Sequence, residues 1–384
     1  PAARVEAQGR TLFMEGTKPR TVSSIGMFDM LKGAGMLTIV FAHTAELYSL
    51  QSVSGLSLTA FFPFIYRESL MAAFFIASGY GFRKRSVGKC IHQQLKTLLK
   101  PYLYTALFTC ALHFLIHYKT FGYLPGTIGE SIKVTGGFLL GLPHTATYFG
   151  QGFFSCGPMW YLLALMVGWI LLDAILNIFP ENYVPWAVAG CALLGWGTSL
   201  VWELPFCLVQ GAVVVPYLYI GFLAKKHRLL DKPLPPKLQA GLIAAAVLIA
   251  VSALLTRTTD CISMAEWSLG PVSILLDGAA GLLFIRLFLR WSRGHGPVVR
   301  FLEAVGRRSL NIFCVHTIEL TAIPWYLMVA KFTGHPLLGM WVQYAVSMGS
   351  IWLVCLLLQA RRSLIVRLFP ARRRTPAVHY TAKH

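Results

Sequence analysis

The stretch from Met27 to Thr44, MFDMLKGAGMLTIVFAHT, has the length and apolar content of a transmembrane helix. It also carries three ionisable side chains, Asp29, Lys32 and His43. A charged side chain in the bilayer core costs about 2.5–3.5 kcal/mol even on the mildest scale, so such residues usually face the protein interior and mark function. We therefore expect this stretch to be the first membrane span and to form one wall of a functional site.

The spacing of these residues places them on one face of the helix. Lys32 and His43 are eleven residues apart, which is close to three full turns, or about 16 Å along the axis. Asp29 and Glu46 fall within the same arc, and Gly33 lets another helix or a ligand approach closely. The alternative is that Asp29 pairs with Lys32 locally and that His43 is a hydrogen-bonded core histidine.

The two types of side chain suit different parts of a reaction. A histidine can take up and release a proton near neutral pH, because its unperturbed pKa is about 6.5. A lysine nearer the cytoplasm can hold an anionic group. Together they indicate a group transfer in which an anionic donor is held from the inside and its reactive end is delivered toward the outer half of the membrane.

The composition of the chain excludes an ordinary soluble protein. Its 384 residues are 56% hydrophobic and 13% charged, with a mean hydropathy of +0.61. The formal charge of +19 does not indicate a nucleic-acid partner, because Lys and Arg occur in short runs between apolar segments. Eight cysteines without CxxC pairs indicate no metal site. A bridge between Cys156 and Cys261 stays open.

Apolar stretches predict an all-α, polytopic integral membrane helical bundle with about ten transmembrane helices in the lipid bilayer. The stretches are 27–48, 63–82, 101–118, 158–179, 183–202, 205–224, 238–256, 270–289, 308–330 and 338–359. The basic clusters all fall on one side of this arrangement, which the positive-inside rule makes cytoplasmic. We predict a cytoplasmic arm over 1–25, a transmembrane domain over 26–360 and a basic cytoplasmic tail over 361–384. The outer loop 119–157, which contains GGFLLGL, is expected to hold a re-entrant or interfacial piece.

The first span resembles the first helix of the acyltransferase-3 family of integral membrane acyltransferases, in which Arg or Lys is followed after ten residues by His. Lys32 and His43 match that pattern. Four further segments resemble the family in chain order: AAFFIASGYGFRKR, LKTLLKPYLY, GPMWYLLALM and GRRSLNIFCVHTIEL. Two features depart from the family. Lys96 and Lys100 stand in place of an Arg-x-x-Arg pair at another spacing, and Phe313 replaces a tyrosine.

The resemblance implies an O-acyltransferase that uses cytoplasmic acyl-CoA, commonly acetyl-CoA, and a hydroxyl of a sugar, polyol or cell-envelope glycan as acceptor. His43 would be the catalytic residue, either as a general base, which we favour, or as a transient acyl carrier. The residues expected to bind acyl-CoA are Lys32, Arg83, Arg85 and Lys96. The residues expected to support the active site are Asp29, Glu46, Trp160, His316 and Glu319. No metal is implied.

Several of these residues also have a plainer structural explanation. Arg83 and Arg85 are also conventional cytoplasmic anchors, and Trp160 fits an interfacial aromatic belt. His316 and Glu319 share a helix face and are equally compatible with a structural hydrogen bond between helices. We expect the protein to lie in a bacterial inner membrane with both termini in the cytoplasm.

A different class of function is a secondary transporter, or a ligand-binding membrane module, that uses Asp29, Lys32 and His43 as a polar relay. Transporters often show inverted repeats and broken helices. The sequence shows neither pattern, which favours the enzyme.

Overall fold

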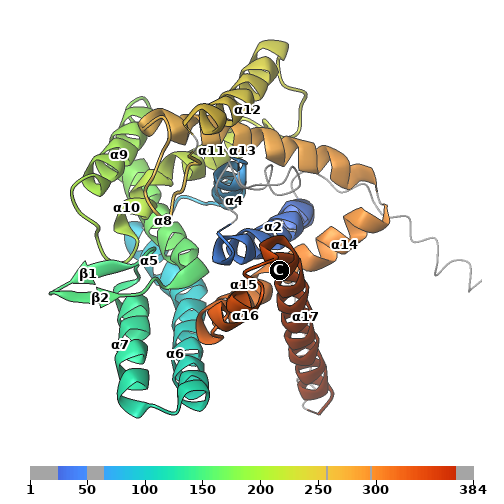
Figure 1. Ribbon diagram of the computed structural model, residues 1–384. Coiled ribbons are helices and arrows are strands. Elements are labelled where there is room, and N and C mark those ends of the chain that lie inside the picture. The colour runs from blue at the N-terminus through green and yellow to red at the C-terminus, as the bar shows by residue number, and fades with distance from the viewer. Residues whose placement is uncertain (1–24, 50–64, 257, 295, 369–384) are drawn as a thin grey trace, which may run out of the picture.

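The structure is a computed structural model that describes residues 25–49, 65–256, 258–294 and 296–368. It is 77% helical, and its described strands form a single short hairpin. The hairpin pairs β1 (Ala146–Tyr148) with β2 (Gln151–Phe153) in antiparallel register. The prediction of a helical bundle is therefore confirmed (Figure 1).

Each predicted apolar stretch contains a helix, and three further α-helices of the described residues, at 87–94, 124–140 and 297–306, lie outside those stretches. In chain order the helices are η1 (Ile25–Phe28), α2 (Asp29–Leu47), α4 (Arg67–Tyr80), α5 (Val87–Gln94), η2 (Leu95–Leu99), α6 (Lys100–Phe121), α7 (Leu124–Leu140), η3 (Gly157–Met159), α8 (Trp160–Ile178), α9 (Val184–Ser199), α10 (Leu208–Val213), α11 (Val215–Lys226), α12 (Pro236–Thr256), α13 (Pro271–Trp291), η4 (Ser292–Gly294), α14 (Pro297–Gly306), α15 (Ser309–Ala322), α16 (Tyr326–Lys331) and α17 (Pro336–Leu368).

Six helical segments in the described part of the chain are long and apolar enough to cross a membrane. They are Val87–Phe121, Gly157–Ile178, Leu208–Lys226, Pro236–Thr256, Pro271–Gly294 and Pro336–Ala360. The helices in the other four predicted spans are too short or not apolar enough to be included. α4 and α15 have 14 residues each, which at 1.5 Å per residue is about 21 Å against about 30 Å of hydrocarbon. The count of ten spans stays a prediction.

The segment 119–157 differs from the loop that we expected. α6 continues to Phe121, and α7 then returns alongside it, so that the first five residues of GGFLLGL form the carboxyl end of a 17-residue helix that ends at Leu140. Tyr102 of α6 donates a hydrogen bond to the carbonyl oxygen of Phe138 at 2.6 Å, which ties the two helices together. Apolar content alone did not predict α7, because four glycines and the Glu130–Lys133 ion pair dilute it.

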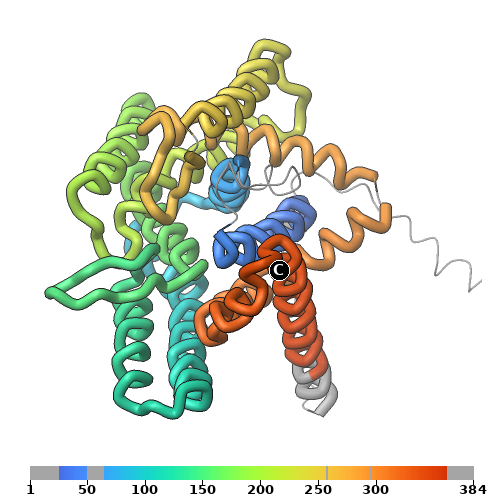
Figure 2. The backbone as a smooth tube through the Cα atoms, in the orientation of Figure 1, coloured from blue at the N-terminus to red at the C-terminus, as the bar shows by residue number. Residues whose placement is uncertain are grey.

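α2 and α4 lie at the centre of the molecule (Figures 1 and 2). α2 contacts α4, α13, α14, α15 and α17, and α4 contacts α11 and α13. In the view of Figure 1 the α6–α7 pair, α12 and α17 extend away from this centre. The residues that the sequence singled out on α2 therefore have helices from distant parts of the chain as neighbours.

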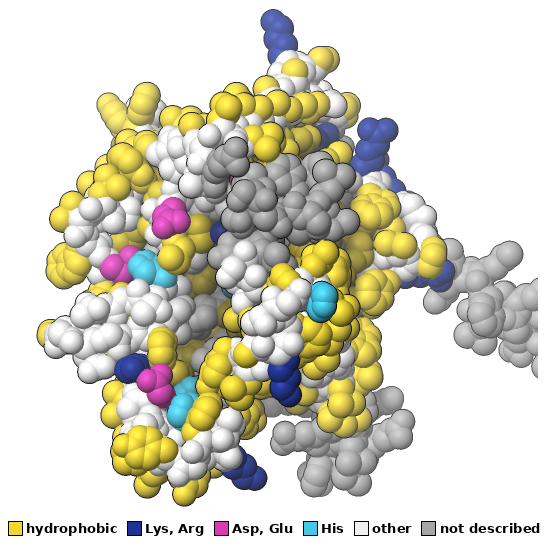
Figure 3. All heavy atoms as spheres, viewed as in Figure 1, with side chains coloured by type: hydrophobic (Ala, Val, Ile, Leu, Met, Phe, Trp, Pro, Cys, Tyr) yellow, Lys and Arg dark blue, Asp and Glu magenta, His cyan; other side chains and the backbone are white. Residues whose placement is uncertain are grey.

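The exterior carries many large apolar side chains. Tyr104, Leu107 and Phe108 on α6 are all more than half exposed, and so are Trp186 and Leu194 on α9. Figure 3 shows hydrophobic side chains over much of the visible face, with few charged groups among them. A surface of this kind fits contact with lipid tails and supports an integral, multi-pass membrane protein.

Two glycines set the close contact between α2 and α14. A Cβ atom on Gly306 would lie 1.7 Å from the carbonyl oxygen of Asp29, and one on Gly33 would lie 1.9 Å from the carbonyl oxygen of Leu302. The two backbones therefore approach without side chains between them. The expectation that Gly33 allows another helix to approach closely is confirmed.

We expect Gly306→Ala to destabilise the protein by about 1–3 kcal/mol, because the added methyl group must push α14 away from the α2 backbone. Thermal unfolding in detergent measures this change. Gly190→Ala in α9 is a matched control, since a Cβ atom on Gly190 would meet no atom within 4 Å. Equal melting temperatures for the Gly306→Ala protein and the wild type would contradict the close contact.

Candidate active site

Lys32 lies in the first turn of α2 and points into a large cavity. Its ammonium group is 3.3 Å from Asp29 Oδ1, so the local pair that the sequence left open is formed. The Asp29 residue is 6% exposed, whereas the Lys32 side chain is 36% exposed. Lys32 therefore neutralises a buried carboxylate and still presents a positive charge to the cavity.

His43 belongs to a chain of charged contacts near the carboxyl end of α2. Its Nδ1 atom lies 3.1 Å from Glu46 Oε2. Arg67, the first residue of α4, donates from Nη1 to Glu46 Oε1 at 2.5 Å and from Nε to Glu68 Oε1 at 3.0 Å. When Nδ1–H donates to Glu46, the neutral imidazole has a free lone pair on Nε2 that can accept a proton.

His316 on α15 repeats this arrangement. Its Nδ1 atom lies 3.0 Å from Glu319 Oε1, three residues further along the helix. Ser347 of α17 donates a hydrogen bond to Glu319 Oε2 at 3.2 Å. The rings of His43 and His316 have centroids 5.5 Å apart and planes tilted by 36°. The structure therefore brings together two histidines that are 273 residues apart in the sequence.

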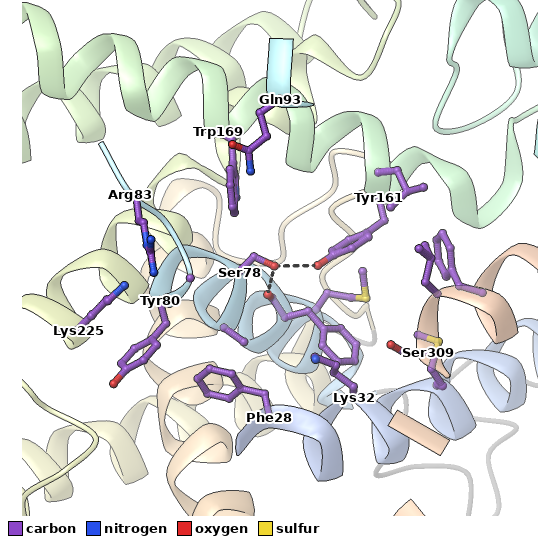
Figure 4. A pocket seen from close by; sticks show the side chains of 18 of the residues that line it. Phe28, Lys32, Ser78, Tyr80, Arg83, Gln93, Tyr161, Trp169, Lys225 and Ser309 are labelled. Carbon is purple, nitrogen blue, oxygen red and sulfur yellow. Dashed lines mark hydrogen bonds between the residues drawn. The ribbon is translucent and has the colours of Figure 1, made fainter. Parts of the chain in front are cut away.

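A cavity of about 790 Å³ runs between α2, α4, α8 and α15. One part of its lining is strongly basic, with Arg83 and Arg85 after α4, Lys225 in the last turn of α11 and Arg228 just beyond that helix. One carboxylate, Asp231, accompanies them and accepts from Arg228 Nε at 2.9 Å. In Figure 4, Arg83 and Lys225 lie on one side of the cavity and Tyr161 lies on the opposite side.

The interior of the cavity is mostly apolar and aromatic, and two of its hydroxyl groups lie close to each other. The Ser78 hydroxyl lies 3.5 Å from that of Tyr161 and donates to the carbonyl oxygen of Phe74 at 2.9 Å (Figure 4). The ring of Tyr161 packs against Phe74 and Phe313. The lining therefore has a cationic part and an apolar part, and the Ser78 and Tyr161 hydroxyls add a polar contact within it.

The cavity ends one helical turn before each histidine. Ile39 lines it on α2, four residues before His43. Phe313 lines it on α15, three residues before His316. Residues three or four positions apart lie on the same helix face. The two histidines therefore lie just beyond the cavity, on the same faces that line it.

The backbone of the basic segment is held by α8. The Arg85 N–H donates to Asp173 Oδ1 at 2.9 Å, and Asn177 Nδ2 donates to the Arg85 carbonyl oxygen at 2.7 Å. Asp173 is fully buried. No sequence pattern singles out this acid, and its structural role is to fix the chain that carries two cavity cations.

A family model described as an acyltransferase domain matches residues 25–360, which is nearly the whole chain. The chain belongs to the acyltransferase-3 family. Neither the curated proteins nor the solved structures gave a match. Membership supports an acyltransferase activity for the protein and agrees with its apolar helices.

Of the ten predicted site residues of this acyltransferase, Lys32, Arg83 and Arg85 line the cavity. Asp29 pairs with Lys32, and the two histidine–glutamate pairs lie just beyond the lining, whereas Lys96 and Trp160 belong to neither group. Lys96 is exposed on the π-helix η2 and is absent from the cavity lining. Trp160 is buried and packs against Phe75 and Tyr161, so its ring faces the core. Cys156 and Cys261, whose pairing the sequence left open, are both buried free thiols.

Sequence reasoning missed two cations in the cavity lining of the acyltransferase, Lys225 and Arg228. They belong to the run KKHR, which we assigned to topology alone. A basic run at the end of a span serves membrane orientation in most proteins. Only the packing of α11 against α4 brings these side chains to the same cavity as Lys32.

Proposed function

We propose that the protein transfers an acyl group, most simply acetyl, from cytoplasmic acyl-CoA to a hydroxyl of a sugar, polyol or cell-envelope glycan. The observation that carries the proposal is one cavity that begins among cations and ends beside a histidine pair. Coenzyme A has the matching order of chemistry, because its phosphates lie at one end, an amide-containing arm follows and the thioester lies at the other end.

The phosphates would bind at the basic part of the cavity. Arg83, Arg85, Lys225 and Arg228 supply up to four positive charges there, and guanidinium groups bind phosphate oxygens in pairs of hydrogen bonds. Lys32, on α2, also lines the cavity. It would contact the donor between the phosphates and the thioester. The positive-inside rule puts the basic end on the cytoplasmic side, where acyl-CoA is made.

The acceptor would be activated by His43. Glu46 fixes the imidazole through Nδ1, so that Nε2 can take the proton of the attacking hydroxyl. The His43 side chain is 29% exposed and that of Glu46 is 33% exposed, so a hydrophilic acceptor can approach this end without passing the donor cavity. The hydroxyl oxygen forms a bond to the acyl carbon, and the bond from that carbon to sulfur breaks.

Binding of coenzyme A to the purified protein in nanodiscs tests the donor site. We expect Arg83→Ala/Lys225→Ala to raise its Kd about tenfold, since loss of partly exposed phosphate contacts worth about 1.4 kcal/mol has this effect. Lys96→Ala is the matched control, because Lys96 is a nearby exposed cation outside the cavity. A larger effect at Lys96 than at the cavity pair would contradict the donor site.

The same preparation distinguishes transfer from transport. Acetyl-CoA is supplied with a glycan and lipid extract of the source membrane, and free thiol is measured. Thiol release that depends on the extract supports the enzyme. Solute movement into proteoliposomes without thiol release would instead support the transporter.

A further inference from the structure

The two histidine–glutamate pairs have the same internal geometry but different surroundings. Each histidine uses Nδ1 toward a carboxylate three residues later, which leaves Nε2 for chemistry. Nε2 of His316 is buried and has no hydrogen-bond partner among the described residues. A buried imidazole nitrogen without a partner costs free energy, and such groups often have a functional explanation.

Exposure separates the two pairs. The His43 side chain is 29% exposed, whereas the His316 side chain is 2% exposed. A group that must meet a hydrophilic acceptor needs the open position, and that is where His43 lies. His316 is enclosed, and Phe313 on the preceding turn lines the proposed donor cavity.

The two glutamates also differ in the charged groups that surround them. Glu46 is paired with the permanent cation Arg67, which it shares with Glu68. Within the described part of the chain, the only ion pair of Glu319 is with His316. Its other side-chain contact, from Ser347, is neutral. The Glu319 carboxylate is therefore the group beside His316 that can stabilise a positive charge while the imidazole holds a second proton.

We propose that His316 is the general acid that protonates the sulfur of the leaving coenzyme A, a role that rests on the proposed acyl transfer. A thiolate expelled into a buried site lacks the water that would stabilise its charge. A proton from Nε2 of His316 converts it to a neutral thiol as the bond from carbon to sulfur breaks.

The proton balance closes over one turnover. The acceptor hydroxyl gives its proton to His43 as its oxygen bonds to the acyl carbon. His316 gives its proton to sulfur, and the products are the ester and the free thiol. The pair still holds one proton, now on His43, and its transfer to His316 across the 5.5 Å ring separation restores the starting state.

Donors with different leaving groups test this role. An aryl thioester of acetic acid releases a far more acidic thiol than coenzyme A, so its departure needs little protonation. We expect His316→Gln to lower the rate with acetyl-CoA about 10²-fold, a typical value for lost acid catalysis, and to lower the rate with the aryl thioester less than about fivefold. His43→Gln is the control and should lose the same factor with both donors.

The outcomes separate the two proposals. Wild-type protein that releases thiol from neither donor would refute the proposed function itself. Active wild-type protein with a His316→Gln variant equally impaired on both donors would overturn the general-acid role and leave the transferase standing. If His316→Gln does not fold, Glu319→Gln keeps the side-chain shape, removes the carboxylate charge and should show the same dependence on the leaving group.

Discussion

Replacing His43 with glutamine is expected to lower acyl transfer about 10²- to 10⁴-fold, the range typical of lost general-base assistance. Glutamine keeps a hydrogen-bonding side chain of similar size but cannot take up a proton. Binding of coenzyme A should stay within about twofold of wild type, because the cavity lining ends at Ile39, one turn before His43. Thiol release and calorimetric binding measure the two quantities separately.

His113→Gln provides the matched control for the substitution of a histidine within a helix. His113 lies on α6, outside the cavity, with its Nδ1 atom 3.4 Å from the Ser131 hydroxyl. This variant should retain transfer. A folded His43→Gln protein with full transfer activity would remove His43 from the chemistry and make His316 the candidate base.

Replacing Lys32 with methionine is expected to raise the KM for acyl-CoA about 10- to 100-fold with little change in kcat. A charge-assisted hydrogen bond to the donor is worth about 1.5–3 kcal/mol, and the contact is made in both the ground state and the transition state. Uniform binding of this kind appears in KM. Steady-state thiol release over a range of acetyl-CoA concentrations gives both constants.

The Asp29–Lys32 pair requires a second variant, because Lys32→Met also leaves the Asp29 carboxylate buried without its partner. Lys32→Met/Asp29→Asn removes both charges. If the donor contact causes the defect, the double variant keeps the high KM. Recovery of the wild-type KM in the double variant would show that the stranded carboxylate caused the defect, and an unchanged KM with a low kcat in Lys32→Met would refute the assignment.

Periodicity within one helix could predict only part of the candidate site. The spacing of Lys32 and His43 fixed their shared face, because a regular helix repeats every 3.6 residues. The same rule linked His316 to Glu319. It could not predict that these two helices bring their histidine rings to 5.5 Å, since that depends on how α2 and α15 pack.

The basic part of the cavity also could not be predicted from local sequence. Arg83 and Lys225 are separated by 142 residues, and each looks like an ordinary cytoplasmic anchor in its own run. Lys96 has the same sequence character but lies outside the lining. Lys225 reaches the cavity that Arg83 lines because α11 packs against α4. No local sequence pattern contains information about this packing.

The contact between α2 and α14 also controls the alignment of the two histidine helices. α14 ends at Gly306, against the Asp29 carbonyl oxygen, and α15 begins at Ser309 after a connection of two residues. A displacement of α14 is therefore passed directly to α15 and changes the offset between the two imidazoles. A misplacement of about 1 Å can cost 10²-fold in rate. Mild crowding at this contact should thus lower turnover by up to about 10²-fold in molecules that remain folded and still bind coenzyme A.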